Sequence, residues 1–325
     1  MTIDPTLAAL SDHLFSISVA LYSLAVVAFC AQLAFGRRPA DAREPELVAA
    51  GAAGRAVPPT APAMVPESAR SRRWGQIAVA VAVLGALTHA GVLVTRGLAA
   101  DRLPWGNMYE FATAMVLVAT VSFLIFAVRM PAVRHLGAFV MGPVVVALVL
   151  IGLFLYAEAG PLVAALRSYW LAVHVTSAIL GFGIFFVSGI ASGAYLLRSR
   201  HDARLAAGQG RGDGVLSRLP SAATLDRVAH RTAVFGFPIW TFAVIAGAIW
   251  AESAWGRFWG WDPKETWAFI AWVVYAAYLH ARTTAGWRGR AAAWVNVTGL
   301  VVMVFNLLYV NMVSTGLHSY AGLPK

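Results

Sequence analysis

Long apolar stretches alternate with shorter polar segments along most of the chain. A helix needs about 20 mainly apolar residues to cross a hydrocarbon core about 30 Å thick. The stretches that approach this length are residues 14–35, 77–95, 111–128, 136–157, 169–197, 232–251, 263–281 and 291–313. The pattern predicts an all-α integral membrane protein with about eight transmembrane helices, and an even number places both termini on the same side of the membrane.

Lysine and arginine are unevenly divided between the connecting segments. Of the 25 in the chain, 19 follow the first, third, fifth and seventh stretches, and 6 lie in the alternate segments. Because cytoplasmic loops are enriched in these residues, the arginine-rich segments are predicted to be cytoplasmic and both termini extracytoplasmic. The net charge of +10 therefore belongs to membrane loops, and no nucleic-acid partner is predicted.

The composition supports a membrane protein, since only 12% of the residues are charged, against about 25% in soluble domains. We predict a first transmembrane helix at residues 1–35, a disordered cytoplasmic linker rich in proline and alanine at 36–73, and a seven-helix membrane domain at 74–325. Cys30 is the single cysteine and lies in an apolar stretch. The chain therefore has no disulfide framework, and without a CxxCH it carries no covalent haem of its own.

A tryptophan-rich loop precedes the seventh stretch, on the predicted external side. Residues 255–265 read Trp-Gly-Arg-Phe-Trp-Gly-Trp-Asp-Pro-Lys-Glu. The tryptophans are Trp255, Trp259 and Trp261. An interfacial aromatic belt accounts for one or two rings at a helix end, and Asp262 with Glu265 forms a capping box. Neither explains three rings with glycines between them, which favour a flat apolar platform for a planar macrocycle.

Four histidines lie in or beside membrane stretches, where ionisable side chains are costly and usually functional. His174 and His318 are both predicted at the level of the tryptophan-rich loop. A lone histidine there is usually an interfacial hydrogen-bonding group, whereas two imidazoles beside an aromatic wall suit a bis-histidine haem. His280 follows Asp262 by 18 residues, about 27 Å along a helix, and cannot share that iron. For His89 we favour an interhelical hydrogen bond over metal ligation.

Two further features lie in the predicted external segments. Asn107 and Glu110 are placed to cap the third stretch, and this is sufficient to explain them. The external cations able to pair with haem propionates are Arg167, Arg257 and Lys264. The sequence does not select among the three.

The run at 255–265 resembles the WWD motif of the haem-handling proteins of cytochrome c maturation. Three further segments extend the similarity: Leu-Arg-Ser-Tyr-Trp-Leu-Ala-Val-His at 166–174, Tyr-Leu-His-Ala-Arg at 278–282 and Gly-Leu-His-Ser-Tyr at 316–320. With them the chain resembles the CcsA (ResC) family of the System II pathway over roughly residues 75–322. The resemblance implies a CcsA-like membrane domain with an external WWD loop at 252–265.

The resemblance also implies a function. The chain is expected to move haem b to the external face of a cell or thylakoid-type membrane and present it, with a CcsB/ResB partner, for thioether attachment to the CxxCH of apocytochrome c. It would form part of a holocytochrome c synthase, with no catalytic residue assigned and with a thioredoxin-like thiol reductant as a further partner. The implied iron ligands are His174, His318 and His280, and the implied haem-contacting residues are Trp255, Trp259, Trp261 and Asp262.

The residues leave three alternatives open. A haem exporter that passes haem to a chaperone would differ only in its acceptor. A b-type electron-transfer subunit would bury both iron ligands inside the helix bundle. A transporter or scaffold without a cofactor would contain no haem.

Overall fold

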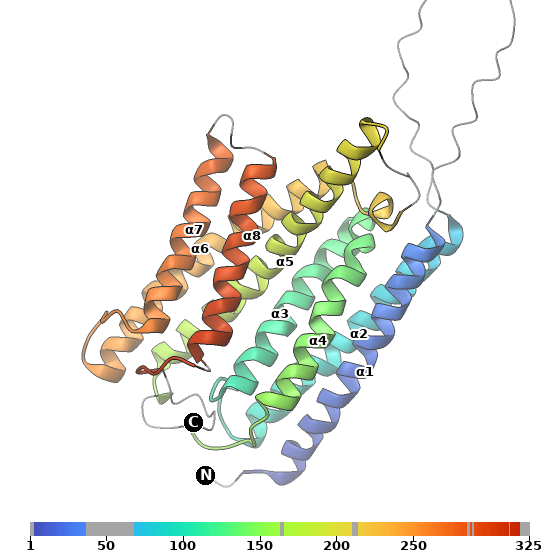
Figure 1. Cartoon of the computed structure of the whole chain (residues 1–325). Coiled ribbons are helices and arrows are strands. Elements are labelled where there is room, and N and C mark those ends of the chain that lie inside the picture. The colour runs from blue at the N-terminus through green and yellow to red at the C-terminus, as the bar shows by residue number, and fades with distance from the viewer. Residues whose placement is uncertain are drawn as a thin grey trace, which may run out of the picture.

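The computed structural model describes residues 3–36, 68–162, 166–209, 214–284, 287, 289–311 and 313–318. Within these residues the chain forms eight α-helices and no strand (Figure 1). The helices are α1 (Pro5–Phe35), α2 (Ala69–Ala99), α3 (Met108–Arg129), α4 (Gly137–Phe154), α5 (Tyr169–Ala206), α6 (Ala222–Trp255), α7 (Pro263–Thr283) and α8 (Arg290–Phe305). A π-helical turn, η4 (Asn306–Val310), continues α8. The all-α prediction is confirmed.

Within the described part of the chain, seven helical segments are long and apolar enough to cross a membrane. The helix outside that set is α7, which has 21 residues and whose tryptophans, tyrosines and charged ends lower its mean hydropathy. Large apolar side chains point outward from the bundle: Leu87 is 63% exposed, Leu153 70% and Phe235 65%. Apolar surfaces of this kind face lipid rather than water. The chain is a multi-pass membrane protein.

The helices lie side by side, with α1 to α4 toward one side of the bundle and α5 to α8 toward the other (Figure 1). One hydrophobic core lies mainly among α1 to α4, and a second lies among α5 to α8. The central helix α5 packs against α3, α6 and α8 and so joins the two groups. The boundary between the groups is therefore lined by α3 on one side and by α5 to α8 on the other.

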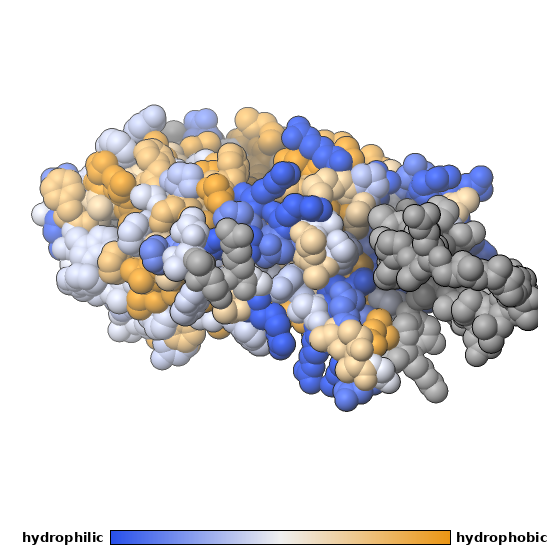
Figure 2. All heavy atoms as spheres, turned by 90° about the horizontal axis from the view of Figure 1, so that it is seen from above, coloured by the Kyte–Doolittle hydropathy of each residue, from blue (hydrophilic) through white to orange (hydrophobic). Residues whose placement is uncertain are grey.

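Successive helices alternate in direction, so each end of the bundle collects its own set of loops. The Trp-loop end, where α7 begins, also holds the start of α1, whose Asp4 N–H donates to Ala99 O at the end of α2 (3.0 Å). The arginine-rich end holds the last residues of α3, α5 and α7. Figure 2, which looks onto this end, shows hydrophilic residues gathered over its middle, with hydrophobic residues between and beside them. The described parts of the segments predicted to be cytoplasmic thus lie at one end of the bundle, and their side of the membrane stays a prediction.

The predicted linker at 36–73 falls mostly outside the described residues, which omit 37–67. Residues 69–73 are helical and open α2. The helix begins there because the Ser68 hydroxyl accepts a hydrogen bond from the backbone N–H of Ser71 (3.1 Å), the usual action of an N-cap serine.

His89 is buried between α1 and α2. Its Nδ1 lies 3.3 Å from the hydroxyl of Tyr22, and the two rings meet edge to face at 5.8 Å between centroids. The predicted interhelical hydrogen bond is confirmed.

Candidate functional site

His174 lies one and a half turns into α5, which begins after the N-cap Ser168. Its Nδ1 is 2.8 Å from the backbone oxygen of Ala243 in α6. Since a carbonyl oxygen only accepts hydrogen bonds, Nδ1 carries the proton and Nε2 carries the lone pair. Gly247 of α6 leaves room for the His174 ring, because a Cβ atom at this position would lie 2.7 Å from the imidazole Nδ1. The ring therefore rests directly on the backbone of α6.

His318 lies in the segment that follows η4. Its Nδ1 is 2.9 Å from Oδ1 of Asp262, the N-cap of α7. A carboxylate only accepts, so Nδ1 again carries the proton and Nε2 the lone pair. Asp262 also accepts from the backbone N–H of Leu317 (2.7 Å), and a Cβ atom at Gly316 would lie 2.4 Å from its Oδ2. The segment thus passes tightly over the start of α7.

The pKa values of His318 and Asp262 are both shifted from their usual range. Burial lowers the pKa of His318, against the opposing effect of the Asp262 carboxylate. Burial raises the pKa of Asp262, but hydrogen bonds from His318 and from the backbone N–H groups of Lys264 and Leu317 lower it to about 2. A neutral imidazole therefore faces an ionised carboxylate. This arrangement matches metal-binding histidines, which donate their other ring N–H to a carboxylate or carbonyl.

Trp250 of α6 connects the two histidines. Its ring is stacked on His174, with 5.9 Å between centroids and 8° between planes, and meets His318 at 5.6 Å and 62°. The indole is 2% exposed. Trp255 lies beside Trp250 and contacts His318, with 5.0 Å between the ring centroids. The structure therefore brings His174 and His318 to one aromatic wall.

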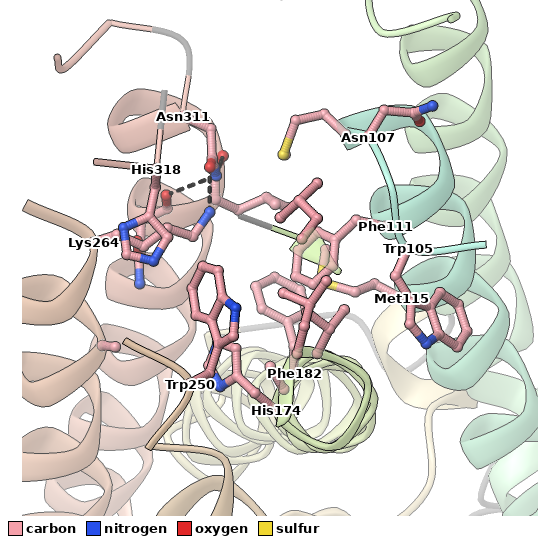
Figure 3. Close-up of a pocket in the computed structure, with 18 of the residues that line it drawn as sticks. Trp105, Asn107, Phe111, Met115, His174, Phe182, Trp250, Lys264, Asn311 and His318 are labelled. Carbon is pink, nitrogen blue, oxygen red and sulfur yellow. Dashed lines mark hydrogen bonds between the residues drawn. The ribbon is translucent and has the colours of Figure 1, made fainter. Parts of the chain in front are cut away.

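Trp250 could not be predicted as a site residue, because an aromatic residue inside an apolar span is typical of any helix core. Most of the residues that line the cavity beside Trp250 are likewise apolar residues of the helices, so the sequence did not distinguish them. This cavity, the His174 cavity, lies between α3, α5, α6, α7 and α8 and includes both histidines (Figure 3). Its aromatic and apolar lining consists of Trp105, Met108, Phe111, Met115, Leu166, Leu171, Val175, Ala178, Phe182, Trp240, Trp250, Ala268, Met303 and Leu307.

The lining of the His174 cavity suits an apolar ligand that carries a few polar groups. The space between its walls, counted together with its open mouth, is about 940 Å³. No group of three or more His, Cys, Asp and Glu side chains among the described residues is arranged to hold a metal ion. Two imidazoles alone supply part of a ligand set, and a metal held in a macrocycle brings its remaining ligands with it.

The three predicted loop tryptophans have different places. Trp255 and Trp259 line a second, smaller cavity that shares His174, His318 and Trp250 with the first. Trp261 is 64% exposed and packs on Trp259 with the ring planes at 89°. The prediction of a flat platform is wrong, because the rings of the loop stand across one another and the wall is built around Trp250.

The loop itself is held by the capping box that the sequence predicts. Glu265 accepts from the backbone N–H groups of Gly260 (2.9 Å) and Asp262 (3.1 Å) and pairs with Arg257 at 3.3 Å. These contacts hold Trp261 at a φ of 58°, a left-handed conformation that is unusual for a bulky residue. Glu265 therefore fixes the course of the loop as well as the start of α7.

A buried ion pair holds the opposite wall. Asn107 caps α3 as predicted, accepting from the backbone N–H of Glu110 (2.9 Å). Glu110 does more than the predicted capping role, since its carboxylate bonds Arg96 (3.0 Å) and Arg102 (2.7 Å) and accepts from Gly106 N–H (2.7 Å). Its side chain is fully buried. Glu110 thus fixes the loop that supplies Trp105 and Asn107 to the cavity.

His280 is not part of this arrangement. It lies near the end of α7, at the arginine-rich end of the bundle, where its ring is exposed and its Nε2 is 3.5 Å from Thr284 Oγ1. The predicted separation of His280 from the other two histidines is confirmed by the course of α7.

Comparison with known proteins gives a consistent result. Residues 105–318 match the family model described as cytochrome C assembly protein. The cytochrome c biogenesis protein CcsA of Parasynechococcus marenigrum (strain WH8102) is 37% identical over 266 residues, covering 76% of this chain and 87% of that protein. CcsA of Gloeobacter violaceus is 32% identical over 299 residues, with the same two coverages.

A solved structure shares the fold. The cytochrome c haem lyase CcmF superimposes with a TM-score of 0.61 at 17% identity, over 94% of this chain and 47% of the CcmF chain. The matched family region begins in the Trp105 loop and ends at His318, so it contains both walls of the His174 cavity. The chain belongs to the cytochrome c assembly protein family, within its CcsA group, and has a role in cytochrome c maturation.

Proposed function

We propose that this chain binds haem b as its substrate between His174 and His318 at the extracytoplasmic face and presents it for attachment to apocytochrome c. One observation carries the proposal: each imidazole donates Nδ1–H to a fixed acceptor, Ala243 O or Asp262 Oδ1, and so offers Nε2 as a base, with Trp250 against both rings. Two neutral imidazoles are the axial ligands of a low-spin b-type haem.

The attachment needs no nucleophile from this chain. Each cysteine thiol of the apocytochrome CxxCH adds across one vinyl group of the haem, so that a C–S bond forms and the thiol hydrogen goes to the other vinyl carbon. No electrons are gained or lost in the addition. The task of His174 and His318 is to hold the ring in one place and then release an axial position to the histidine of the substrate. Trp250 and Trp255 exclude water from the ring face.

The remaining parts of the proposal concern partners. His280, exposed near the end of α7, is proposed to hold haem at an earlier stage, with the opposing histidine supplied by the CcsB/ResB partner. A thioredoxin-like reductant keeps the apocytochrome thiols reduced. A b-type electron-transfer subunit is less consistent with this site, because His318 lies after the last helix rather than inside the bundle.

The test is a spectrum of the chain purified with its co-expressed CcsB/ResB partner. We expect a low-spin bis-histidine b-type spectrum that is strongly weakened in His174→Ala and His318→Ala, with loss of holocytochrome c in a reporter strain. His13→Ala is the matched control, because His13 is exposed in α1. A wild-type complex that stays free of haem when haem is supplied, or normal maturation in either variant, would refute the proposal.

A further inference from the structure

The three cations that the sequence offers as propionate partners have different surroundings. Arg257 pairs with Glu265 at 3.3 Å and has a side chain 32% exposed. Arg167 is exposed and donates from Nε to the backbone oxygen of Leu162 (3.1 Å). Lys264 alone of the three lines the His174 cavity, and it also lines the smaller cavity beside it. Of the three cations, Lys264 is therefore the one placed to contact a ligand in the His174 cavity.

The contacts that the structure describes for the Lys264 ammonium group are with a neutral amide and an aromatic ring. Its ammonium group donates to Oδ1 of Asn311, a neutral amide, and lies 5.7 Å from the centroid of the Phe111 ring. Its neighbour Asp262 is engaged by His318, by Leu317 and by the backbone of Lys264 itself. Within the part of the chain that the structure describes, Lys264 forms no ion pair with a carboxylate. An ammonium group has three N–H donors and can accept an anionic ligand there.

The polar residues that line the cavity are Asn107, His174, Lys264, Asn306, Asn311 and His318. Lys264 lies in the first turn of α7 and Asn311 follows η4, so both lie near helix ends. Figure 3 shows Lys264, Asn311 and His318 together on one side of the cavity. Met115 and Phe182, which lie deeper in their helices, line it elsewhere. Such a cavity favours a ligand that is apolar over most of its area and anionic at one edge.

We propose that Lys264 binds a propionate carboxylate of the haem held by His174 and His318, and so fixes how the ring is rotated. The assignment rests on the proposed function. Two axial nitrogens define a single line through the iron, and a ring held only along that line can rotate about it. One charge-assisted contact at the ring edge removes this freedom. Each vinyl group then keeps one position relative to the protein, as attachment to a particular cysteine requires.

The experiment compares ferric protoporphyrin IX with its dimethyl ester, which keeps the iron and the apolar ring but has no carboxylate. Both are titrated into the chain purified with its partner, and the Kd ratio of ester to free acid is read from the absorption spectrum. A hydrogen bond to a charged group contributes about 1.5–3 kcal/mol, so wild type should prefer the free acid by about 10- to 150-fold. Lys264→Met should reduce this ratio to near one, and Lys264→Arg should keep most of it.

The ratio within one protein sample is insensitive to partial misfolding, which weakens both ligands alike. Arg167→Gln is the matched control, since it removes an external cation that does not line the His174 cavity. Equal wild-type affinity for acid and ester, with binding still dependent on His174 and His318, would overturn the assignment of Lys264 alone. Full preference retained in Lys264→Met would do the same. Failure of wild type to bind either ligand would overturn the proposed function and this inference with it.

Discussion

Asp262 accepts a hydrogen bond from Nδ1 of His318 over 2.9 Å, although 56 residues separate them in the chain. The same carboxylate caps α7 and accepts from the backbone of Leu317. A single side chain therefore starts a helix, fixes the tautomer of a histidine and holds the segment that carries it. The tryptophan-rich loop meets the same histidine, since the Trp255 ring lies 5.0 Å from that of His318 between centroids.

Replacing Asp262 by alanine should misplace His318 while leaving the bundle folded. Loss of a partner that orients a metal-binding histidine reduces metal affinity or activity by about 10- to 100-fold, and we expect a decrease of that order in haem affinity. The measurement is a haem titration of the complex. Asp4→Ala is the matched control, because Asp4 also caps a helix, α1, through Thr6 and Leu7 but contacts neither histidine. Equal haem affinity in the two variants would contradict the assigned role of Asp262.

Gly247→Ala should disturb His174 selectively. Alanine favours a helix over glycine by about 1 kcal/mol, but here its Cβ would lie 2.7 Å from the imidazole, so the ring must move away from α6. We expect a changed or weakened bis-histidine spectrum without lower thermal stability. The control is Gly142→Ala in α4, where no atom lies within 4 Å of the added Cβ. Wild-type spectra in Gly247→Ala would show that the ring position does not depend on this contact.

Acidification should release the C-terminal segment from α7. The folded pKa of His318 is lowered by burial, so the released state binds more protons below about pH 6.5, the unperturbed value, and docking weakens as the pH falls. Asp262 has a folded pKa of about 2, so its contribution is complete above about pH 4 and is lost between there and pH 2. Both groups act in the same direction, with His318 titrating first.

The measurement for this prediction is hydrogen exchange of the Leu317 amide, which donates to Asp262 (2.7 Å), in protein without haem and corrected for the intrinsic exchange rate. Protection should decrease below about pH 6.5. His318→Gln should lose the first part of this pH dependence. Protection that rises on acidification would reverse the sign and reject the explanation.

Glu110→Gln should be among the most destabilising single changes at the Trp-loop end. It removes the carboxylate shared by the guanidinium groups of Arg96 and Arg102, which are 2% and 9% exposed, and leaves Arg96 with Asp12 at 3.8 Å. Breaking a buried pair from one side costs about 3–5 kcal/mol. Asp202→Asn is the control: it breaks the Arg198–Asp202 pair, whose aspartate is 43% exposed, and should cost less than about 1 kcal/mol. Thermal unfolding in detergent compares them, and similar values for the two variants would contradict the prediction.

Some features of the chain follow from the sequence because they depend on local chemistry. The spans follow from the need to satisfy every backbone polar group inside lipid, and the apolar stretches place all eight helices. The start of α7 follows from Asp262, Pro263 and Glu265, because the contacts that cap the helix lie within one turn. The common level of His174 and His318 follows from counting residues along helices of fixed rise.

Tertiary structure decided the remaining features, for a physical reason specific to membranes. Both the lipid-facing and the buried sides of these helices are apolar, so hydropathy does not reveal which side of α6 carries Trp250 or which side of α5 faces Trp240. The tautomers of His174 and His318 depend on acceptors 69 and 56 residues away. In the sequence, Lys264 and Arg257 are both predicted external cations near the start of α7. Packing places Lys264 at the His174 cavity and pairs Arg257 with Glu265. Local sequence fixed where each helix begins and how deep each histidine lies, and packing between distant segments fixed which groups meet.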